Sequence, residues 1–207
     1  AWVRIDGTEE LCHVKNTGRL GELLLPEAVV YLEHSNKSER KTRWDLIAVE
    51  SGRQIVKIDS QAPNRVFGAF AASGAFRPDL EYIRPEFTYG DSRFDFRLEC
   101  HGAVQFVEVK GVTLLRDGRA LFPDAPTERG IKHLRGLMRA VQEGYEAAAV
   151  FGIQMKQAQA FSPNDETQSA FGQALREAAR AGVALYAYDC QVTPDHLSID
   201  APVPIEL

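Results

Sequence analysis

The 207-residue chain has few cysteines and no long hydrophobic run. Cys12, Cys100 and Cys190 are far apart and odd in number, and no CxxC pair occurs. This excludes a disulfide framework and argues against a zinc site. No apolar run approaches the roughly 18 residues of a transmembrane helix, and the start AWVRIDGTEE lacks the regions of a signal peptide. These absences predict a cytoplasmic protein with no membrane partner. Because the chain has no initiator methionine, we also expect residues before Ala1.

The chain also lacks an excess of positive charge. It has 24 Lys and Arg against 29 Asp and Glu, and its net charge is −5. Residues 1–70 carry ten groups of each sign, so the acid excess lies wholly after them. Strong nonspecific nucleic-acid binding needs several Lys and Arg on phosphates, and the composition argues against it. Solvated surface acids explain most of the excess, and a carboxylate cluster that needs a divalent cation would add to it.

Two different patterns divide the chain. Residues 1–60 contain short runs rich in Val, Ile and aromatic residues, separated by NTG, SNKS and SG turns, which is typical of a small β-barrel or sandwich. Helix-capable and strand-like segments alternate afterwards, which predicts a mixed sheet with helices packed on it. We therefore expect an α+β protein with domains at 1–61 and 62–207. The predicted helices cover 62–74, 127–146 and 164–182.

Several local signals refine this prediction. Thr127 or Asp124 is the expected N-cap of the helix over 127–146, and the segment 116–126 reads as a loop. Asn64 is a candidate cleft-lining residue, with a helix cap as the alternative, and NTG predicts a β-turn in which Gly18 supplies backbone freedom. The expected apolar stripe of the helix over 127–146 consists of Ile131, Leu134, Met138 and Val141.

The segment FVEVKGVTLL (106–115) carries two opposite charges inside an apolar run. Glu108 and Lys110 lie on one face, because residues two apart in a strand point the same way. Asp95 precedes Glu108 by thirteen residues, enough for one hairpin. One or two carboxylates suffice to hold Mg²⁺, and Lys110 would orient water and counter phosphate charge. This is the PD-(D/E)xK nuclease motif. The alternative is an ordinary ion pair, because Glu-x-Lys is common by chance.

Cations and one aromatic residue supply candidate nucleic-acid contacts. A basic stripe on the helix over 127–146 suits phosphate contacts, although a solvated helix face is the usual explanation. His133 on that helix is interpreted as a packed residue or a nucleic-acid contact. Near residue 43, cations beside a Trp suit stacking on single strands, and a charged hairpin is the alternative. The candidates are Arg43, Trp44, Arg65, Arg93, Arg129, Lys132 and His133.

The motifs RFDF, FVEVKGVTL, FPDAPTERGIKHL, NTGR and PNRVF together resemble the sugar fermentation stimulation protein (SfsA) family over nearly the whole chain. The resemblance implies an N-terminal OB-like β-barrel, here without its first strand, and a PD-(D/E)xK restriction-endonuclease-like α/β domain. It implies that Asp95, Glu108 and Lys110 are catalytic. Mg²⁺ or Mn²⁺ would be held by Asp95, Glu108 and the carbonyl of Val109, with Glu86 as a further ligand.

The function expected from the motif and the resemblance is that of a metal-dependent nuclease acting on DNA or RNA, with DNA favoured. The alternative is a non-catalytic DNA-binding regulator of sugar (maltose) utilisation built on a nuclease fold. A third interpretation is a scaffold protein with a relic site. The intact acids favour the nuclease, because without a metal they repel phosphate. The oligomeric state stays open, with a dimer as one alternative.

Overall fold

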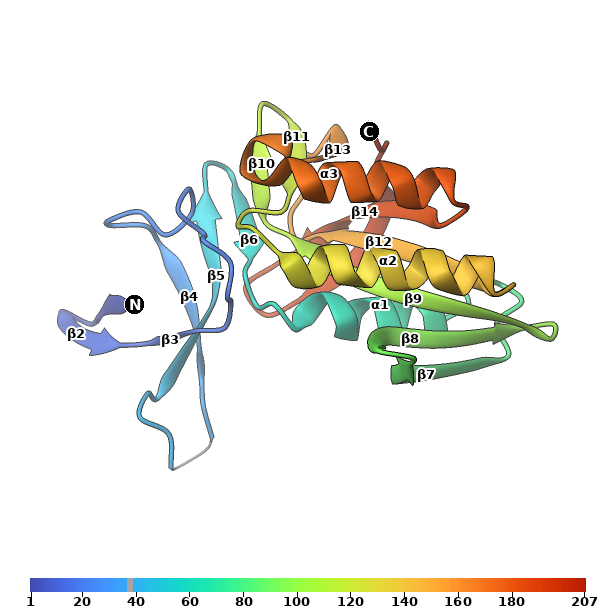
Figure 1. Cartoon of the computed structure of the whole chain (residues 1–207). Helices are drawn as coiled ribbons and strands as arrows, with labels where there is room; N and C mark the ends of the chain where they lie inside the picture. The colour runs from blue at the N-terminus through green and yellow to red at the C-terminus, as the bar shows by residue number, and fades with distance from the viewer. Residues whose placement is uncertain (37–38) are drawn as a thin grey trace.

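The computed structural model describes residues 1–36 and 39–207. The predicted SNKS turn (35–38) therefore lies partly outside the described residues. The N-terminal part, at the left of Figure 1, contains two small sheets. In the larger one, β5 is central and pairs with β3, β4 and β6, whereas β1 and β2 pair with each other. The strands are β1 (Trp2–Ile5), β2 (Thr8–Leu11), β3 (His13–Val14), β4 (Val30–His34), β5 (Trp44–Ser51) and β6 (Gln54–Lys57).

A six-stranded mixed sheet organises the C-terminal part, in the order β15-β14-β12-β9-β8-β7. The three central strands β9, β12 and β14 run parallel, and the outer strands are antiparallel to their neighbours. The strands are β7 (Tyr82–Tyr89), β8 (Ser92–Cys100), β9 (Ala103–Val112), β12 (Glu146–Ile153), β14 (Ala184–Val192) and β15 (Leu197–Pro202).

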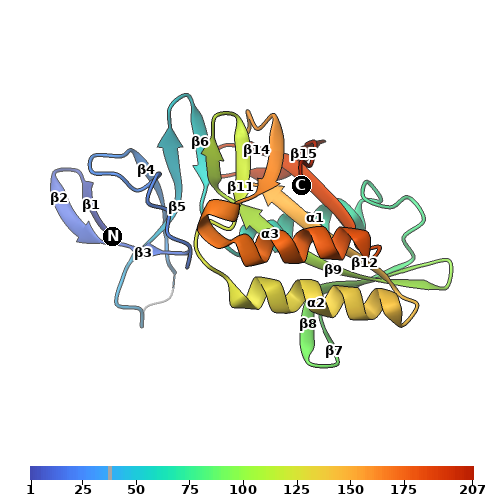
Figure 2. The same ribbon diagram turned by 45° about the horizontal axis from the view of Figure 1, so that its top comes forward.

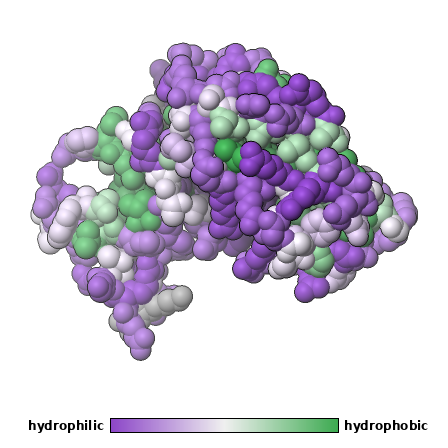
Figure 3. All heavy atoms as spheres, viewed as in Figure 1, coloured by the Kyte–Doolittle hydropathy of each residue, from purple (hydrophilic) through white to green (hydrophobic). Residues whose placement is uncertain are grey.

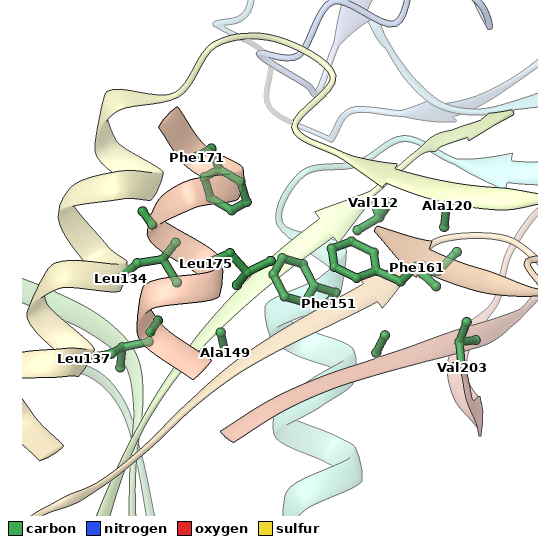
Figure 4. Packing of buried hydrophobic residues seen from close by; sticks show 14 of the residues in the cluster. Val112, Ala120, Leu134, Leu137, Ala149, Phe151, Phe161, Phe171, Leu175 and Val203 are labelled. Atoms are coloured by element: carbon green, nitrogen blue, oxygen red, sulfur yellow. The ribbon is translucent and has the colours of Figure 1, made fainter. Parts of the chain in front are cut away.

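Helices cover both faces of this sheet. The helix α1 (Ala62–Ala72) packs on one face, while α2 (Glu128–Gln142) and α3 (Asp165–Arg180) lie side by side on the other (Figures 1 and 2). Two hydrophobic clusters result, one on each face. In Figure 4, leucines of α2 and Phe171 and Leu175 of α3 gather near Phe151 of the sheet. Leu137 and Ala140 of α2 are fully buried, deeper than the predicted stripe members Met138 and Val141.

The predicted loop over 116–126 is wrong in its first half. Strands β10 (Leu114–Arg116) and β11 (Arg119–Phe122) form a hairpin, and β11 pairs in parallel with β13 (Ala160–Pro163). The turn residues Asp117 and Gly118 both have positive φ, at 50° and 76°. Asp-Gly between two short strand-like runs is a strong hairpin signal, so the sequence contained the information.

The surface of the N-terminal part is less polar than the surface over the helices. Figure 3 shows hydrophobic residues exposed on the N-terminal part, while the surface over the helices is largely hydrophilic. Trp2, Leu25 and Val29 are more than half exposed and line a cavity of about 960 Å³ in that part. All three cysteines are buried, and none of them forms a disulfide. Within the described chain, none of the helices has the length and apolar character needed to cross a membrane.

Candidate functional site

The hairpin of β8 and β9 opens at its end nearest the N-terminal part. The two strands pair from Cys100 and Ala103 as far as Phe96 and Val107, and then separate. Past this point, the backbone N–H of Val109 donates to Oδ2 of Asp95 at 2.8 Å rather than to a β8 carbonyl. On its other edge β9 stays paired with β12 through Val112. The separation makes room for carboxylates between two ordered strands.

Strand β8 changes the face that it buries at the same point. Strict alternation predicts that Asp95 faces away from both Phe94 and Phe96. Instead, Phe94 packs in the cluster beneath α2, and Phe96 packs in the cluster against α1. The opposite residue on β7, Glu86, has φ +54°, and neither Glu86 nor Asp95 has a partner in the ladder of the two strands. Asp95 therefore lies at a local irregularity of the hairpin.

Two hydrogen bonds orient the Asp95 carboxylate. Oδ2 accepts from Val109, and Oδ1 accepts from Asn64 Nδ2 of α1 at 2.7 Å. Asn64 is thus a partner of Asp95 and does not cap α1, in which it is the third residue. Burial raises the pKa of Asp95, and the charge of Glu108 raises it further. The raised pKa means that the ionised acid is disfavoured here unless a cation lies nearby.

The two oxygens of Glu108 have different surroundings. The residue is only 2% exposed, and its Oε1 is hydrogen-bonded to both Lys110 Nζ and His133 Nδ1. Burial alone raises the pKa of Glu108, but the hydrogen bond from His133 and the charge of Lys110 outweigh it, so the pKa is lowered. Oε2 is buried and has no hydrogen-bond partner. A buried acceptor without a partner costs free energy, and a cation would satisfy it.

The carboxylates lie in a cavity of about 380 Å³ between the two parts of the molecule. Residues from β8, β9, α1, the NTGR segment (16–19) and the connection into α2 (122–127) line it. In the described part of the chain, no group of three or more His, Cys, Asp and Glu is arranged to hold a metal. Two carboxylates still suit Mg²⁺, which keeps several water ligands. Glu108 Oε2 has no hydrogen-bond partner, and burial disfavours the ionised form of Asp95. Both features fit a divalent cation.

Asp124 ties the NTGR segment to the connection into α2. Its Oδ2 accepts from the backbone N–H groups of Arg19 and Leu20, at 3.0 and 3.5 Å. Asn16 donates to Ile58 O and accepts from Gly18 N, both at 2.6 Å. The cap of α2 is Thr127, whose Oγ1 accepts from Gly130 N, so the alternative cap Asp124 is excluded.

The prediction that position 18 needs glycine for its backbone freedom is wrong. Its φ is not in the left-handed region, so freedom of the backbone is not required. A Cβ there would lie 2.9 Å from Asn16 Oδ1 and still closer to Asp124 Oδ2. Gly18 is needed because the segment passes this close to the Asp124 carboxylate.

The substitution Gly18→Ala is expected to destabilise the protein by about 1–3 kcal/mol, because the added methyl group overpacks this contact. Urea unfolding measures the difference. Gly21→Ala is the matched control: the nearest atom to its Cβ would be 3.7 Å away, so its effect should stay within about 0.5 kcal/mol. Equal stabilities of the two variants would contradict the role given to Gly18.

The structure brings most of the predicted metal-site residues together. Asp95, Glu108, Val109 and Lys110 all line the cavity. Glu86 does not: its side chain is 69% exposed, and its Oε2 lies 2.5 Å from Arg93 Nη2. The positive φ of Glu86 occurs where the ladder between β7 and β8 is interrupted, and the side chain is left in solvent. Glu86 is therefore not positioned as a metal ligand.

On α2, the predicted nucleic-acid contacts are divided between surface and interior. Arg129 lines the cavity. Lys132 is exposed and lies 3.5 Å from Asp91, outside the cavity. His133 is only 6% exposed and is bonded to Glu108, so it is not a surface contact for nucleic acid. The helical period that places Arg129 and Lys132 on the surface turns His133 toward the sheet.

The other candidates lie apart from the cavity. Arg65 bonds to the buried Asp59 at 2.8 Å and lines a separate cavity. Arg43 is 71% exposed and pairs with Glu10 at 2.9 Å. Trp44 packs edge-on against His34 and lines the cavity of about 960 Å³ in the N-terminal part. The structure therefore does not gather these residues around Asp95.

The fold and the site define an α+β protein with an N-terminal OB domain and a C-terminal domain built on a mixed α/β sheet. Residues 1–58 match the family model of the SfsA N-terminal OB domain, and residues 61–196 match that of the sugar fermentation stimulation protein RE domain. The chain belongs to the sugar fermentation stimulation protein (SfsA) family. The predicted fold class and family are thus confirmed.

Relatives in other organisms are similar over most of their length. The chain is 52% identical to a sugar fermentation stimulation protein homolog of Desulfitobacterium hafniense, covering all of this chain and 90% of that protein. It is 47% identical to the homolog of Clostridium beijerinckii, covering 96% and 88%. The solved structure of Pyrococcus furiosus SfsA in complex with Ca²⁺ has a TM-score of 0.91 and 27% identity, covering 100% of this chain and 90% of that one.

Asn64 lines the cavity, as one interpretation of the sequence expected, but the partners of Asn64, Asp124 and His133 were not predicted. Their hydrogen bonds join residues 31, 105 and 25 positions apart. Local patterns carry no information on such pairs. The motifs PNRVF and FPDAPTERGIKHL, which contain these residues, were the available signal.

Proposed function

We propose that the protein is a metal-dependent nuclease that hydrolyses phosphodiester bonds in DNA or RNA, with DNA favoured. One observation carries the proposal: Glu108, whose buried Oε2 has no hydrogen-bond partner, lines the cavity together with Asp95 and Lys110. A divalent cation would satisfy Oε2 and would favour the ionised form of Asp95. Pure binding of nucleic acid does not require such acids, which repel phosphate.

Asp95 and Glu108 would hold Mg²⁺ or Mn²⁺, with the carbonyl of Val109 as a further oxygen ligand. Bound there, such an ion polarises the phosphoryl group and makes its water a stronger nucleophile. The solved P. furiosus relative is a complex with Ca²⁺, a hard cation that prefers oxygen ligands, and this supports a divalent cation here.

The chain's own side chains would orient the reacting groups. Lys110 Nζ is held by Glu108 Oε1, and the side chain of Lys110 is 19% exposed. From this position its ammonium group would orient the attacking water and offset the charge that grows on the phosphate. Arg129, on the first turn of α2, would contact the phosphate of the bound strand.

The test is cleavage of a labelled panel of single-stranded, duplex and branched DNA and RNA with Mg²⁺, Mn²⁺ or EDTA. We expect cleavage that requires metal and disappears in the double variant Asp95→Ala/Lys110→Ala. Glu166→Ala/Arg116→Ala is the matched control, because it removes an exposed acid and an exposed base that pair with each other outside the cavity. No cleavage of any substrate, with equal nucleic-acid binding by all three proteins, would overturn the proposal. It would favour the non-catalytic DNA-binding regulator of sugar utilisation.

A further inference from the structure

We infer that His133 is a positioning residue, which holds Glu108 through an Nδ1–H hydrogen bond so that Oε2 is left free for the cation. The inference rests on the proposed function, because it assigns a role toward the same cation. His133 lies in the second turn of α2, and α2 packs on β8 and β9. Its ring is 6% exposed and contacts the carboxylate 25 residues away in sequence.

The hydrogen bonds of Glu108 are asymmetric. Lys110 and His133 both bond to Oε1, whereas Oε2 has none. A carboxylate that only needed partners would distribute two donors over its two oxygens. Placing both on Oε1 fixes the rotation of the carboxylate and directs Oε2 away from them. Hydrogen bonds behind a metal ligand of this kind orient the ligand and tune its affinity.

Arg129 determines which ring nitrogen of His133 carries the proton. Arg129 Nε lies one helical turn earlier and donates to His133 Nε2 at 3.4 Å. A guanidinium group has no acceptor, so Nε2 must accept with its lone pair. The proton then lies on Nδ1, which donates to Glu108. Arg129, His133 and Glu108 form a chain of donors that ends at Oε1.

The close approach of α2 to the sheet fixes the position of the ring. A Cβ at Gly136, three residues after His133, would lie 2.6 Å from Ser92 Oγ and 3.2 Å from Phe94. One turn earlier, Thr127 caps the helix through Gly130. The helix is thus held at both ends of the turn that carries His133, and the imidazole can act as a rigid support.

Cation affinity measured without substrate separates this role from simple packing. Calorimetric titration with Ca²⁺ and with Mn²⁺ would compare wild-type protein, His133→Leu and His133→Asn. The amide nitrogen of asparagine takes the place of Nδ1 and keeps the donor, whereas leucine fills the space without one. We expect His133→Leu to weaken binding about 10–100-fold and His133→Asn to retain most of it. His101→Leu, in an exposed turn, is the control. Melting curves in EDTA verify that each variant is folded.

The proton position has its own spectroscopic readout. Long-range ¹H–¹⁵N correlation spectra of the metal-free protein should show His133 with the proton on Nδ1 and a lone pair on Nε2. A neutral ring with its only proton on Nε2 would overturn the inference. So would equal cation affinities of wild-type protein and His133→Leu.

The two proposals fail in distinguishable ways. Weaker cation binding in His133→Leu, rescued in His133→Asn, together with no cleavage of any nucleic acid, would overturn the nuclease and support the positioning role. Metal-dependent cleavage by the wild-type protein, with unchanged cation affinity in His133→Leu, would support the nuclease and overturn the positioning role. No cation binding by the wild-type protein would overturn both.

Discussion

Replacing Glu108 by glutamine is expected to lower the rate of metal-dependent cleavage by at least about 10³-fold, or roughly 4 kcal/mol in the activation barrier. The substitution preserves shape but removes the charge. Because Lys110 and His133 both donate to Oε1, the carbonyl oxygen of the new amide must stay there. Its NH₂ group then takes the place of Oε2 and presents donors where the cation needs an acceptor.

Single-turnover cleavage of the best substrate, at saturating Mg²⁺, measures this effect. Glu81→Gln makes the same chemical change at an exposed position that does not line the cavity, and should cut like the wild-type protein. A Glu108→Gln variant that cuts within about tenfold of the wild-type rate would show that Glu108 does not hold the cation.

Replacing Asp95 by asparagine is expected to stabilise the metal-free protein while abolishing cleavage. Burial and the charge of Glu108 raise the pKa of Asp95, so its ionised form costs stability at neutral pH. Asparagine removes that charge. Its carbonyl can still accept from Val109 N, and Asn64 can rotate its amide to accept from the new NH₂ group. A gain of about 1 kcal/mol would raise the melting temperature by roughly 2–4 °C.

The dependence on pH follows from the direction of the shift. The folded state holds the Asp95 proton more tightly than the unfolded chain does. The penalty therefore develops as pH rises from the ordinary value of 3.8 through the raised pKa, and is complete above it. The stability difference between the variant and the wild-type protein should be largest at neutral pH and shrink as the pH falls toward 4.

Calcium should reverse the order of stability. At 100 times its dissociation constant, a ligand stabilises the protein that binds it by about 2.7 kcal/mol. The wild-type protein should gain this stabilisation and Asp95→Asn should not. The variant should therefore have the higher melting temperature in EDTA, and the wild-type protein the higher one in Ca²⁺. A variant less stable than wild-type protein in EDTA, or equally stabilised by Ca²⁺, would contradict the electrostatic description of Asp95.

Local patterns predicted the part of the site that lies on one strand. The period of two placed Glu108 and Lys110 on one face of β9, and the structure joins them by a hydrogen bond. The same rule failed at Asp95, because β8 changes its buried face between Phe94 and Phe96. Such a change depends on how two sheet faces are packed against different helices, which no local pattern records.

The residues that hold the site in place do so through contacts between segments that are distant in the sequence. His133 was interpreted as a packed residue or a nucleic-acid contact. It is buried, and its bond to Glu108 follows from where α2 crosses the sheet. Of the two predicted caps of α2, Thr127 is confirmed, whereas Asp124 accepts from the backbone of the NTGR segment. Helix boundaries were predictable from caps and apolar spacing. The partners of these polar side chains were not.

The central claim is that Asp95 and Glu108 together hold a divalent cation at the reaction site. Anomalous diffraction from crystals of the protein soaked in Mn²⁺ tests it most directly. The account predicts a manganese peak within about 2.0–2.6 Å of Glu108 Oε2 and of an Asp95 carboxylate oxygen. A cavity that shows no peak at saturating Mn²⁺, or a cation bound only elsewhere on the molecule, would contradict it.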